Sequence, residues 1–201
     1  MKTKHIVLAG DSIFDNDGYV PGEAGVIEQL RKSIHPDWSA SKIAVDGDCI
    51  RHVADQIKNL PSNTTDLIVS VGGNDARHHT HLFNQVTSAQ SLNDLLAQPL
   101  AGFRLSYREM LKAIQQSNLQ LQVCTIYTEI PFHEPLWRQL APMAISLFNA
   151  VITDEARVCN IPVLRLHEVC ILESDFSEIS PIEPSSLGGQ KIVDHILKGF
   201  I

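Results

Sequence analysis

Three short segments of the chain carry residue types that serve acyl-transfer chemistry. They are Gly10-Asp11-Ser12, a turn that contains Gly47, and Gly72-Gly73-Asn74-Asp75. A serine nucleophile needs hydrogen-bond donors around the oxyanion that it creates. The backbone N–H groups of Ser12 and Gly47 and the side-chain amide of Asn74 are three candidate donors. Glycine at position 47 leaves its N–H unshielded because it has no Cβ.

The elements that must position these segments alternate between strand and helix. Short apolar runs predict buried strands at 6–9, 42–45, 67–71, 121–126 and 161–166. Helical spacing of apolar residues predicts helices at 20–34, 50–60, 95–116, 138–158 and 185–197, the third with a break near Pro99 and Gly102. The polar stretch 74–93 is long for a connection, so it is either functional or partly helical. This order predicts an α/β fold of three layers, α/β/α, with a five-stranded parallel sheet. Sites in such sheets lie at the carboxyl ends of the strands, which is where the three segments fall.

The segments, in this order and at these strand ends, resemble the SGNH (GDSL-type) hydrolase superfamily. The combination of Gly-Asp-Ser after a first strand with Gly-x-Asn-Asp after a third carries the resemblance. The resemblance covers nearly the whole chain and implies one domain, 1–201, with a flavodoxin-like fold. It also implies esterase-like acyl transfer, with Ser12 as nucleophile and Ser12, Gly47 and Asn74 as the oxyanion hole.

The C-terminal segment departs from the family pattern of Asp-x-x-His followed by glycine and the last helix. With the glycines aligned, Glu183 stands at the histidine position and Ser180 at the aspartate position. With Asp175 taken as the motif aspartate, Glu178 falls at the histidine position instead. The ending Ile-Glu-Pro-Ser…Gly-Gly is similar to that of a bacterial subgroup of SGNH-like sequences that lacks the usual Asp-x-x-His.

Two kinds of residue are candidates for the missing base. Glu183 is one, although a free glutamate has a pKa of about 4.3 and becomes a useful base only where burial raises that value. The same residue has a structural interpretation, as a carboxylate that favours the N-terminus of the last helix. The other candidates are histidines in loops at the same sheet edge, at positions 78, 79, 133 and 167.

Four further residues are candidates for supporting or substrate-binding roles. Asp11 is expected to brace the nucleophile turn through hydrogen bonds to backbone N–H groups. Asp15 either lines the pocket or caps the first helix together with its neighbour Asn16. Asp75 is expected to hold the loop of Asn74, and His79 lies close by in the sequence. The apolar and aromatic segment 130–137 either covers an acyl group or is an ordinary packed loop.

Composition limits the remaining possibilities. The 201 residues suit one domain, and 16 basic against 23 acidic residues give a net charge of −7. Such a chain is not expected to bind nucleic acid or an anionic membrane, and it has no apolar run long enough for a membrane span. The apolar stretch 6–9 is too short for an export signal, and the four cysteines form no C-x-x-C pair. We therefore expect a cytoplasmic protein with reduced thiols and no cofactor.

The sequence thus predicts a serine-dependent hydrolase of small ester or acyl substrates, which works through an acyl-serine with an atypical base. The alternative is a binding protein that kept the oxyanion donors, lost its base, and holds a small carboxylate, acyl or sugar ligand. A third hypothesis is a hydrolase that uses a metal ion at His78, His79 and His81, although no known ligand spacing supports it. The sequence gives no indication of the oligomeric state.

Overall fold

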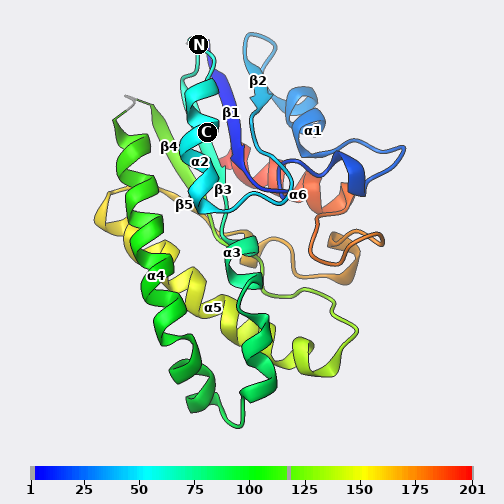
Figure 1. Ribbon diagram of the computed structural model, residues 1–201. Coiled ribbons are helices and arrows are strands. Elements are labelled where there is room, and N and C mark those ends of the chain that lie inside the picture. The colour runs from blue at the N-terminus through cyan, green and yellow to red at the C-terminus, as the bar shows by residue number, and fades with distance from the viewer. Residues whose placement is uncertain (1–2, 117–118, 201) are drawn as a thin grey trace.

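The computed structural model describes residues 3–116 and 119–200, which form one five-stranded sheet flanked by helices (Figure 1). The strands are β1 (His5–Gly10), β2 (Ser39–Lys42), β3 (Asp66–Ser70), β4 (Gln120–Cys124) and β5 (Val163–Leu164). All neighbouring strands pair in parallel, in the order β2-β1-β3-β4-β5. The predicted α/β fold with a five-stranded parallel sheet is therefore confirmed.

Two strands differ from the predicted ranges. The chain after β2 still runs beside β1, because Ile43 and Ala44 both donate backbone hydrogen bonds to Leu8 O, at 2.8 and 3.2 Å. Because two successive residues bond to one carbonyl, the β2 side has one residue more than β1, as in a β-bulge. The regular pairing of β2 therefore ends at Lys42, the residue at which the sequence predicts the strand to begin. β5 is only two residues long because the chain coils at once into a 3-10 helix, η4 (Leu166–Glu168).

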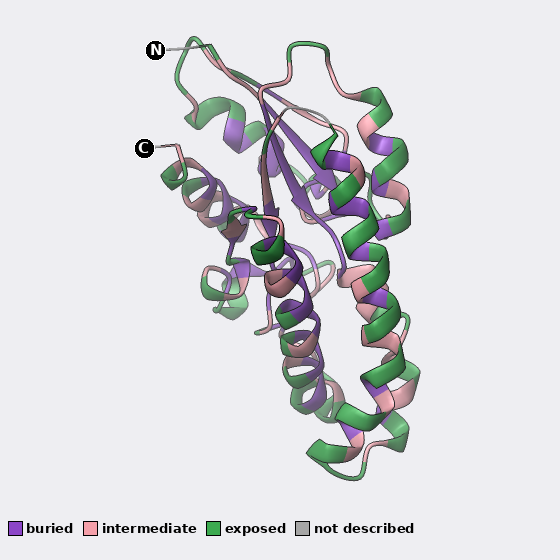
Figure 2. Ribbon diagram, turned by 90° about the vertical axis from the view of Figure 1, so that its left-hand side faces the viewer, coloured by how far each residue is buried: buried purple, intermediate pink, exposed green. Residues whose placement is uncertain are grey.

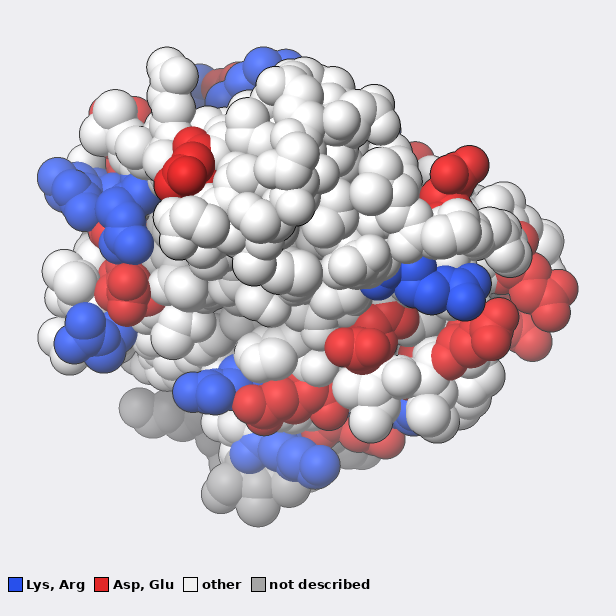
Figure 3. Space-filling model, turned by 90° about the horizontal axis from the view of Figure 1, so that it is seen from below, with Lys and Arg blue, Asp and Glu red and all other residues white. Residues whose placement is uncertain are grey.

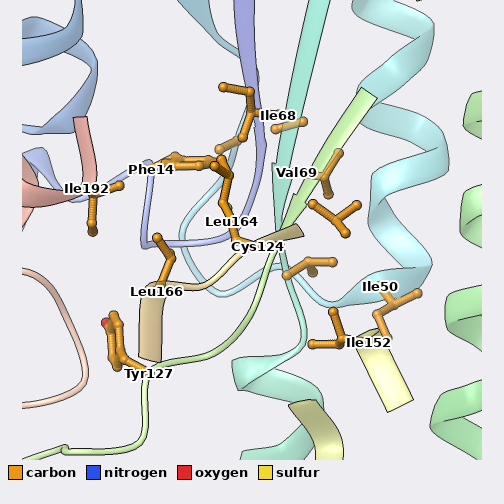
Figure 4. Packing of buried hydrophobic residues seen from close by; sticks show 14 of the residues in the cluster. Phe14, Ile50, Ile68, Val69, Cys124, Tyr127, Ile152, Leu164, Leu166 and Ile192 are labelled. Carbon is orange, nitrogen blue, oxygen red and sulfur yellow. The ribbon is translucent and has the colours of Figure 1, made fainter. Parts of the chain in front are cut away.

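Helices cover both faces of the sheet. α1 (Val26–Ser33) packs beside α6 (Ser186–Lys198) on one face, and α2 (Ile50–Gln56), α4 (Ala89–Gln115) and α5 (Pro135–Val158) cover the other. The strands between them are the most buried part of the molecule (Figure 2). In the core, Phe14 and Ile192 lie on one side of the strands, and Ile50 and Ile152 lie on the other (Figure 4). Within the described ranges, no helix is both long and apolar enough to cross a bilayer.

Two of the predictions for the helices need correction. The first helix begins at Val26 rather than at position 20, since Pro21 and Gly22, with its φ of +81°, interrupt the preceding segment. The predicted break near Pro99 is wrong, because α4 runs without interruption. Its buried residues Leu92, Leu96 and Phe103 lie on both sides of the proline, so their packing holds the helix together despite the lost hydrogen bond.

The polar stretch 74–93 is partly helical, as one of the two interpretations expected. It contains most of α3 (Gly73–Arg77), the 3-10 helix η3 (Thr80–Gln85) and the first turn of α4. The other 3-10 helices are η1 (Asp17–Tyr19), η2 (Ile57–Asn59) and η5 (Glu173–Asp175).

The sheet has its topological switch point between β1 and β3. The chain leaves β1 toward β2 on one side and leaves β3 toward β4 on the other, so a crevice opens at the ends of these two strands. Gly10 makes the close approach there possible. Its φ is +120°, and a Cβ at this position would lie 1.8 Å from the carbonyl oxygen of Ser70 on β3. The loops that carry Ser12 and Asn74 both start at this crevice.

Candidate active site

The structure brings Ser12 and Glu183 together from positions 171 residues apart. The Ser12 hydroxyl donates a hydrogen bond to Glu183 Oε1 at 3.0 Å. Both residues are buried, with 6% of Ser12 and 3% of Glu183 exposed. In this arrangement the carboxylate is placed to accept the proton of the serine hydroxyl.

Burial raises the pKa of Glu183 to about 7. The hydrogen bond from Ser12 lowers this pKa, the nearby charge of Asp46 raises it and that of Arg77 lowers it, but desolvation is the largest effect. The second carboxylate oxygen, Oε2, is buried and accepts no hydrogen bond from any described residue. Near neutral pH both the ionised and the protonated forms of this carboxyl group are therefore present. Its Oε1 accepts the hydrogen bond from Ser12, and its Oε2 has no partner among the described residues.

The backbone around Glu183 is fixed on both sides. Glu183 N donates to Ser180 O at 3.1 Å, and Glu183 O accepts from Ser177 N at 2.8 Å. The Tyr127 hydroxyl donates to Ile182 O. These bonds fix the loop so that the carboxylate side chain reaches the nucleophile.

Asn16 joins the loop of the nucleophile to the loop of Glu183. Its Nδ2 donates to Pro184 O at 3.1 Å, and its Oδ1 accepts from Val26 N at 2.9 Å, at the start of α1. The residue is fully buried. Ser185 caps the last helix by accepting a hydrogen bond from Gly188 N at 3.1 Å. The Glu183 side chain therefore contacts Ser12, and the hydroxyl of Ser185 caps the N-terminus of α6.

The three predicted oxyanion donors differ in how many of their N–H groups are hydrogen-bonded within the protein. Among the described residues, the backbone N–H groups of Ser12 and Gly47 donate to no protein acceptor. Asn74 Nδ2 donates one hydrogen bond to Asp48 O at 3.0 Å, which leaves its second N–H free. Gly47 lies on an exposed turn with a φ of +81°, a conformation that favours glycine.

Gln56 connects the nucleophile turn to the Gly47 turn. Its Oε1 accepts from Gly10 N at 2.8 Å, and its Nε2 donates to Gly10 O and to Asp48 Oδ2, each at 2.7 Å. The same Asp48 holds Asn74 through its carbonyl oxygen. A single buried amide thus fixes the relative positions of the segments that carry the nucleophile and the donors. Sequence reasoning missed it, because a polar residue on the apolar face of a predicted helix is no specific signal.

Three of the predicted supporting carboxylates hold backbone segments of the site. Asp11 Oδ1 accepts from Ile13 N at 3.2 Å, and Asp75 Oδ2 accepts from Ile50 N at 3.1 Å at the start of α2. Asp15 Oδ2 accepts from Asp46 N at 2.8 Å, next to Gly47.

The charges around these carboxylates differ. The other oxygen of Asp15 pairs with Lys42. Burial raises the pKa of Asp11 well above its ordinary range, and the carboxyls of Glu183 and Asp75 raise it further. Burial also raises the pKa of Asp75.

No histidine takes the place of Glu183. Among the described residues, none donates to or accepts from Ser12. His167 is hydrogen-bonded to Thr125 Oγ1 at 2.8 Å, and His133 is exposed. His79 lines the cavity beside Ser12, with its ring stacked on Phe148 at a centroid distance of 6.4 Å. Burial lowers the pKa of His79.

The metal-ion hypothesis and the alternative alignment on Asp175 find no site among the described residues. In residues 3–116 and 119–200, no three His, Cys, Asp or Glu side chains are grouped to hold a metal ion, and this includes His78, His79 and His81. Asp175, the alternative motif aspartate, accepts hydrogen bonds from the backbone of residues 171 and 172 and pairs with Lys191. Glu178 is exposed.

A cavity of about 100 Å³ opens beside the nucleophile. Asp11, Ser12, Asn74, Arg77 and Glu183 all border it. Most of the remaining lining is apolar and comes from α4, α5, η3 and the segment 126–132. The apolar and aromatic segment that the sequence placed at the edge of the site does border this cavity, through Ile130, Phe132 and Trp137.

Solved structures with a similar fold include lipases and esterases. A lipase from a goat rumen metagenome matches with a TM-score of 0.73 at 17% identity, over 97% of this chain and 96% of that one. The extracellular lipase of Streptomyces rimosus matches with a TM-score of 0.72 at 16% identity, over 97% and 99%. The chain has the fold of the SGNH (GDSL-type) hydrolases.

A member of the lipolytic G-D-S-L family from Veillonella parvula has the same fold. It matches with a TM-score of 0.67 at 17% identity, over 99% of this chain and 98% of that one. No protein-family model matches the chain, and no curated protein does. At this identity the likeness establishes the fold, and the chemistry depends on the residues of the site.

Proposed function

We propose that the protein is a serine hydrolase of small esters in which Glu183 replaces the usual histidine as general base. The observation that carries the proposal is the hydrogen bond from Ser12 Oγ to a buried carboxylate whose pKa is about 7. A general base is most effective when its pKa lies near the working pH, and an ordinary glutamate falls short of that.

The first half of the reaction forms an acyl-enzyme. Ser12 Oγ attacks the ester carbonyl carbon and forms a C–O bond while Glu183 takes the hydroxyl proton. The carbonyl oxygen becomes an oxyanion, which the N–H groups of Ser12, Gly47 and Asn74 stabilise. The bond to the leaving oxygen then breaks, and that oxygen departs as an alcohol with the proton that Glu183 held. The product is an ester of the acyl group with Ser12.

The second half returns the free enzyme. A water molecule attacks the acyl carbon and gives its proton to Glu183, and the same three donors stabilise the second oxyanion. The bond between the acyl carbon and Ser12 Oγ breaks, and the serine oxygen takes the proton back from Glu183. The carboxylic acid product then leaves.

A binding protein is the second candidate function. A bound carboxylate would occupy the three donors of the oxyanion hole as well as a transition state does, and a protonated Glu183 would donate to it. The raised pKa of Glu183 and its unoccupied Oε2 are the observations that favour this candidate.

Hydrolysis of p-nitrophenyl acetate by the wild type and Ser12→Ala separates the two. The control is Ser106→Ala, which removes an exposed hydroxyl from α4. The proposal expects at least a roughly hundredfold loss of kcat/KM in Ser12→Ala and none in the control. Unchanged hydrolysis in Ser12→Ala contradicts the proposal. An inactive wild type that acetate stabilises against heat supports the binding protein.

A further inference from the structure

The cavity beside Ser12 has one polar end and a long apolar body. The charged residues that border it are Asp11, Arg77 and Glu183. Asp11 precedes the nucleophile, Glu183 is bonded to it, and Arg77 is close enough to lower the pKa of Glu183. The charges therefore gather at the nucleophile, and a ligand that fills the cavity needs its polar group there.

The apolar body follows α5 away from the nucleophile. Trp137 and Phe148, which both border the cavity, are eleven residues apart on this helix, a length of about 16 Å. Trp137 packs edge-on against Phe83 and Phe132, with ring centroids at 5.9 and 5.4 Å. These three aromatic rings make up one wall of the apolar part.

Two alanines on α5 leave room in the middle of this body. Ala141 and Ala144 both border the cavity, and each is 5% exposed. They are three residues apart and share a face of the helix with Ile145 and Phe148, whose side chains are much larger. A larger side chain at either alanine would project into the space that the cavity now occupies.

The volume of the cavity sets the size of its occupant. A cavity needs roughly 10–15 Å³ to hold one water molecule. The volume of about 100 Å³ is several times larger, so the cavity holds a ligand group larger than a single water molecule or methyl group.

The wall that α5 contributes to the apolar part carries no charge, since its lining residues are Trp137, Ala141, Ala144, Ile145 and Phe148. Seen from below, the molecule has a broad area of uncharged side chains, and acidic and basic groups lie across the lower half of the view and along its sides (Figure 3). His79, whose ring stacks on Phe148, has a pKa that burial lowers.

From these observations we propose that the substrate is an ester of an apolar acyl chain longer than acetyl, whose accepted length Ala141 and Ala144 determine. The inference rests on the proposed function, since it places the ester carbonyl at Ser12 and the chain in the apolar body.

The first test is a chain-length series of p-nitrophenyl esters, from acetate through butyrate and hexanoate to octanoate. Each buried methylene is worth roughly a fourfold gain, so kcat/KM is expected to rise roughly fifteenfold for each two carbons until the cavity is full. A flat or falling series, with hydrolysis that depends on Ser12, overturns the inference and leaves the proposed function intact.

The second test changes the cavity. Ala144→Leu is expected to lower kcat/KM for the octanoate ester at least tenfold and kcat/KM for the acetate ester less than threefold. Ala141→Val is a smaller change that serves if Ala144→Leu does not fold. Ala150→Leu is the matched control, because Ala150 lies on the exposed face of the same helix. Equal effects on the acetate and octanoate esters in a folded cavity variant contradict the inference.

A binding measurement separates failure of the cavity from failure of the chemistry. Octanoate and acetate are added to the full-length Ser12→Ala protein, and its melting temperature is measured. Stabilisation by octanoate, and not by acetate at the same concentration, supports the acyl cavity even if no ester is hydrolysed. Absence of stabilisation by octanoate contradicts the inference whatever the activity.

Discussion

Replacing Glu183 by glutamine tests the buried carboxylate through stability as well as through activity. Glutamine has nearly the same shape and keeps an oxygen that accepts from Ser12. A rise of the pKa from 4.5 to about 7 corresponds to a free-energy difference of about 3 kcal/mol, at about 1.4 kcal/mol for each pKa unit. This energy is what the folded protein loses when the carboxyl ionises in its buried position.

The direction of the pH dependence follows from which state holds the proton. Between about pH 4.5 and 7 the folded protein keeps the Glu183 proton, whereas the unfolded chain has released it. The free energy of unfolding therefore falls as the pH rises through this window and stays lower above it. Glu183→Gln has no proton to lose there. The substitution also removes the Glu183 charge that raises the pKa of Asp11. This second effect likewise makes the variant more stable than the wild type at high pH.

Urea unfolding at pH 5 and at pH 8.5 measures the effect. We expect Glu183→Gln and the wild type to be nearly equally stable at pH 5, and the variant to be more stable by up to about 3 kcal/mol at pH 8.5. Glu178→Gln is the control, since Glu178 is exposed on the same loop. A stability difference that is the same at both pH values, or that favours the wild type at pH 8.5, refutes the reasoning.

Three further predictions concern the residues around this pair. Arg77→Gln removes a charge that lowers the pKa of Glu183, so the acid limb of the activity profile is expected to move to higher pH, more at low salt than at high; an unmoved limb at low salt contradicts this. Asn74→Ala removes one oxyanion donor and is expected to lower kcat roughly 100- to 1,000-fold with little change in KM, measured by steady-state kinetics; a change confined to KM shows instead that Asn74 only binds substrate. Gln56→Leu leaves the polar groups of Gly10 and Asp48 without their partner. The free energy of unfolding in urea is therefore expected to fall by about 1–3 kcal/mol for each buried group left unpaired. Unchanged stability rules out the connecting role of Gln56.

The five strands of the parallel sheet could be predicted because they are distinctive in sequence. β1 and β3 are buried on both faces and read as unbroken apolar runs bounded by glycine. The exact ends of β2 and β5 could not be predicted, since they depend on hydrogen bonds to neighbouring strands and on a 3-10 turn. The continuity of α4 through Pro99 was missed for a similar reason, because packing outweighs the local preference of proline.

The candidate site was predictable where chemistry requires a residue type in a fixed place. Ser12 and Asn74 follow directly from their strand ends, and alignment on the last glycines gave Glu183. Gln56 was not predicted as a site residue, and Asn16 was considered only together with Asp15, as a residue that lines the pocket or caps the first helix. Their amides act through partners that are 46 and 168 residues away in the chain, and only the folded structure shows such pairs.

The measurement that tests the central claim most directly is the pH dependence of kcat/KM for p-nitrophenyl ester hydrolysis in the wild type and Glu183→Gln. With Glu183 as the base of Ser12, wild-type kcat/KM rises tenfold per pH unit at low pH and levels off above an apparent pKa of about 7. Glu183→Gln loses roughly 100- to 10,000-fold in rate together with this acid limb. A variant that keeps the wild-type rate and the same limb contradicts the account, because another group would then be the base.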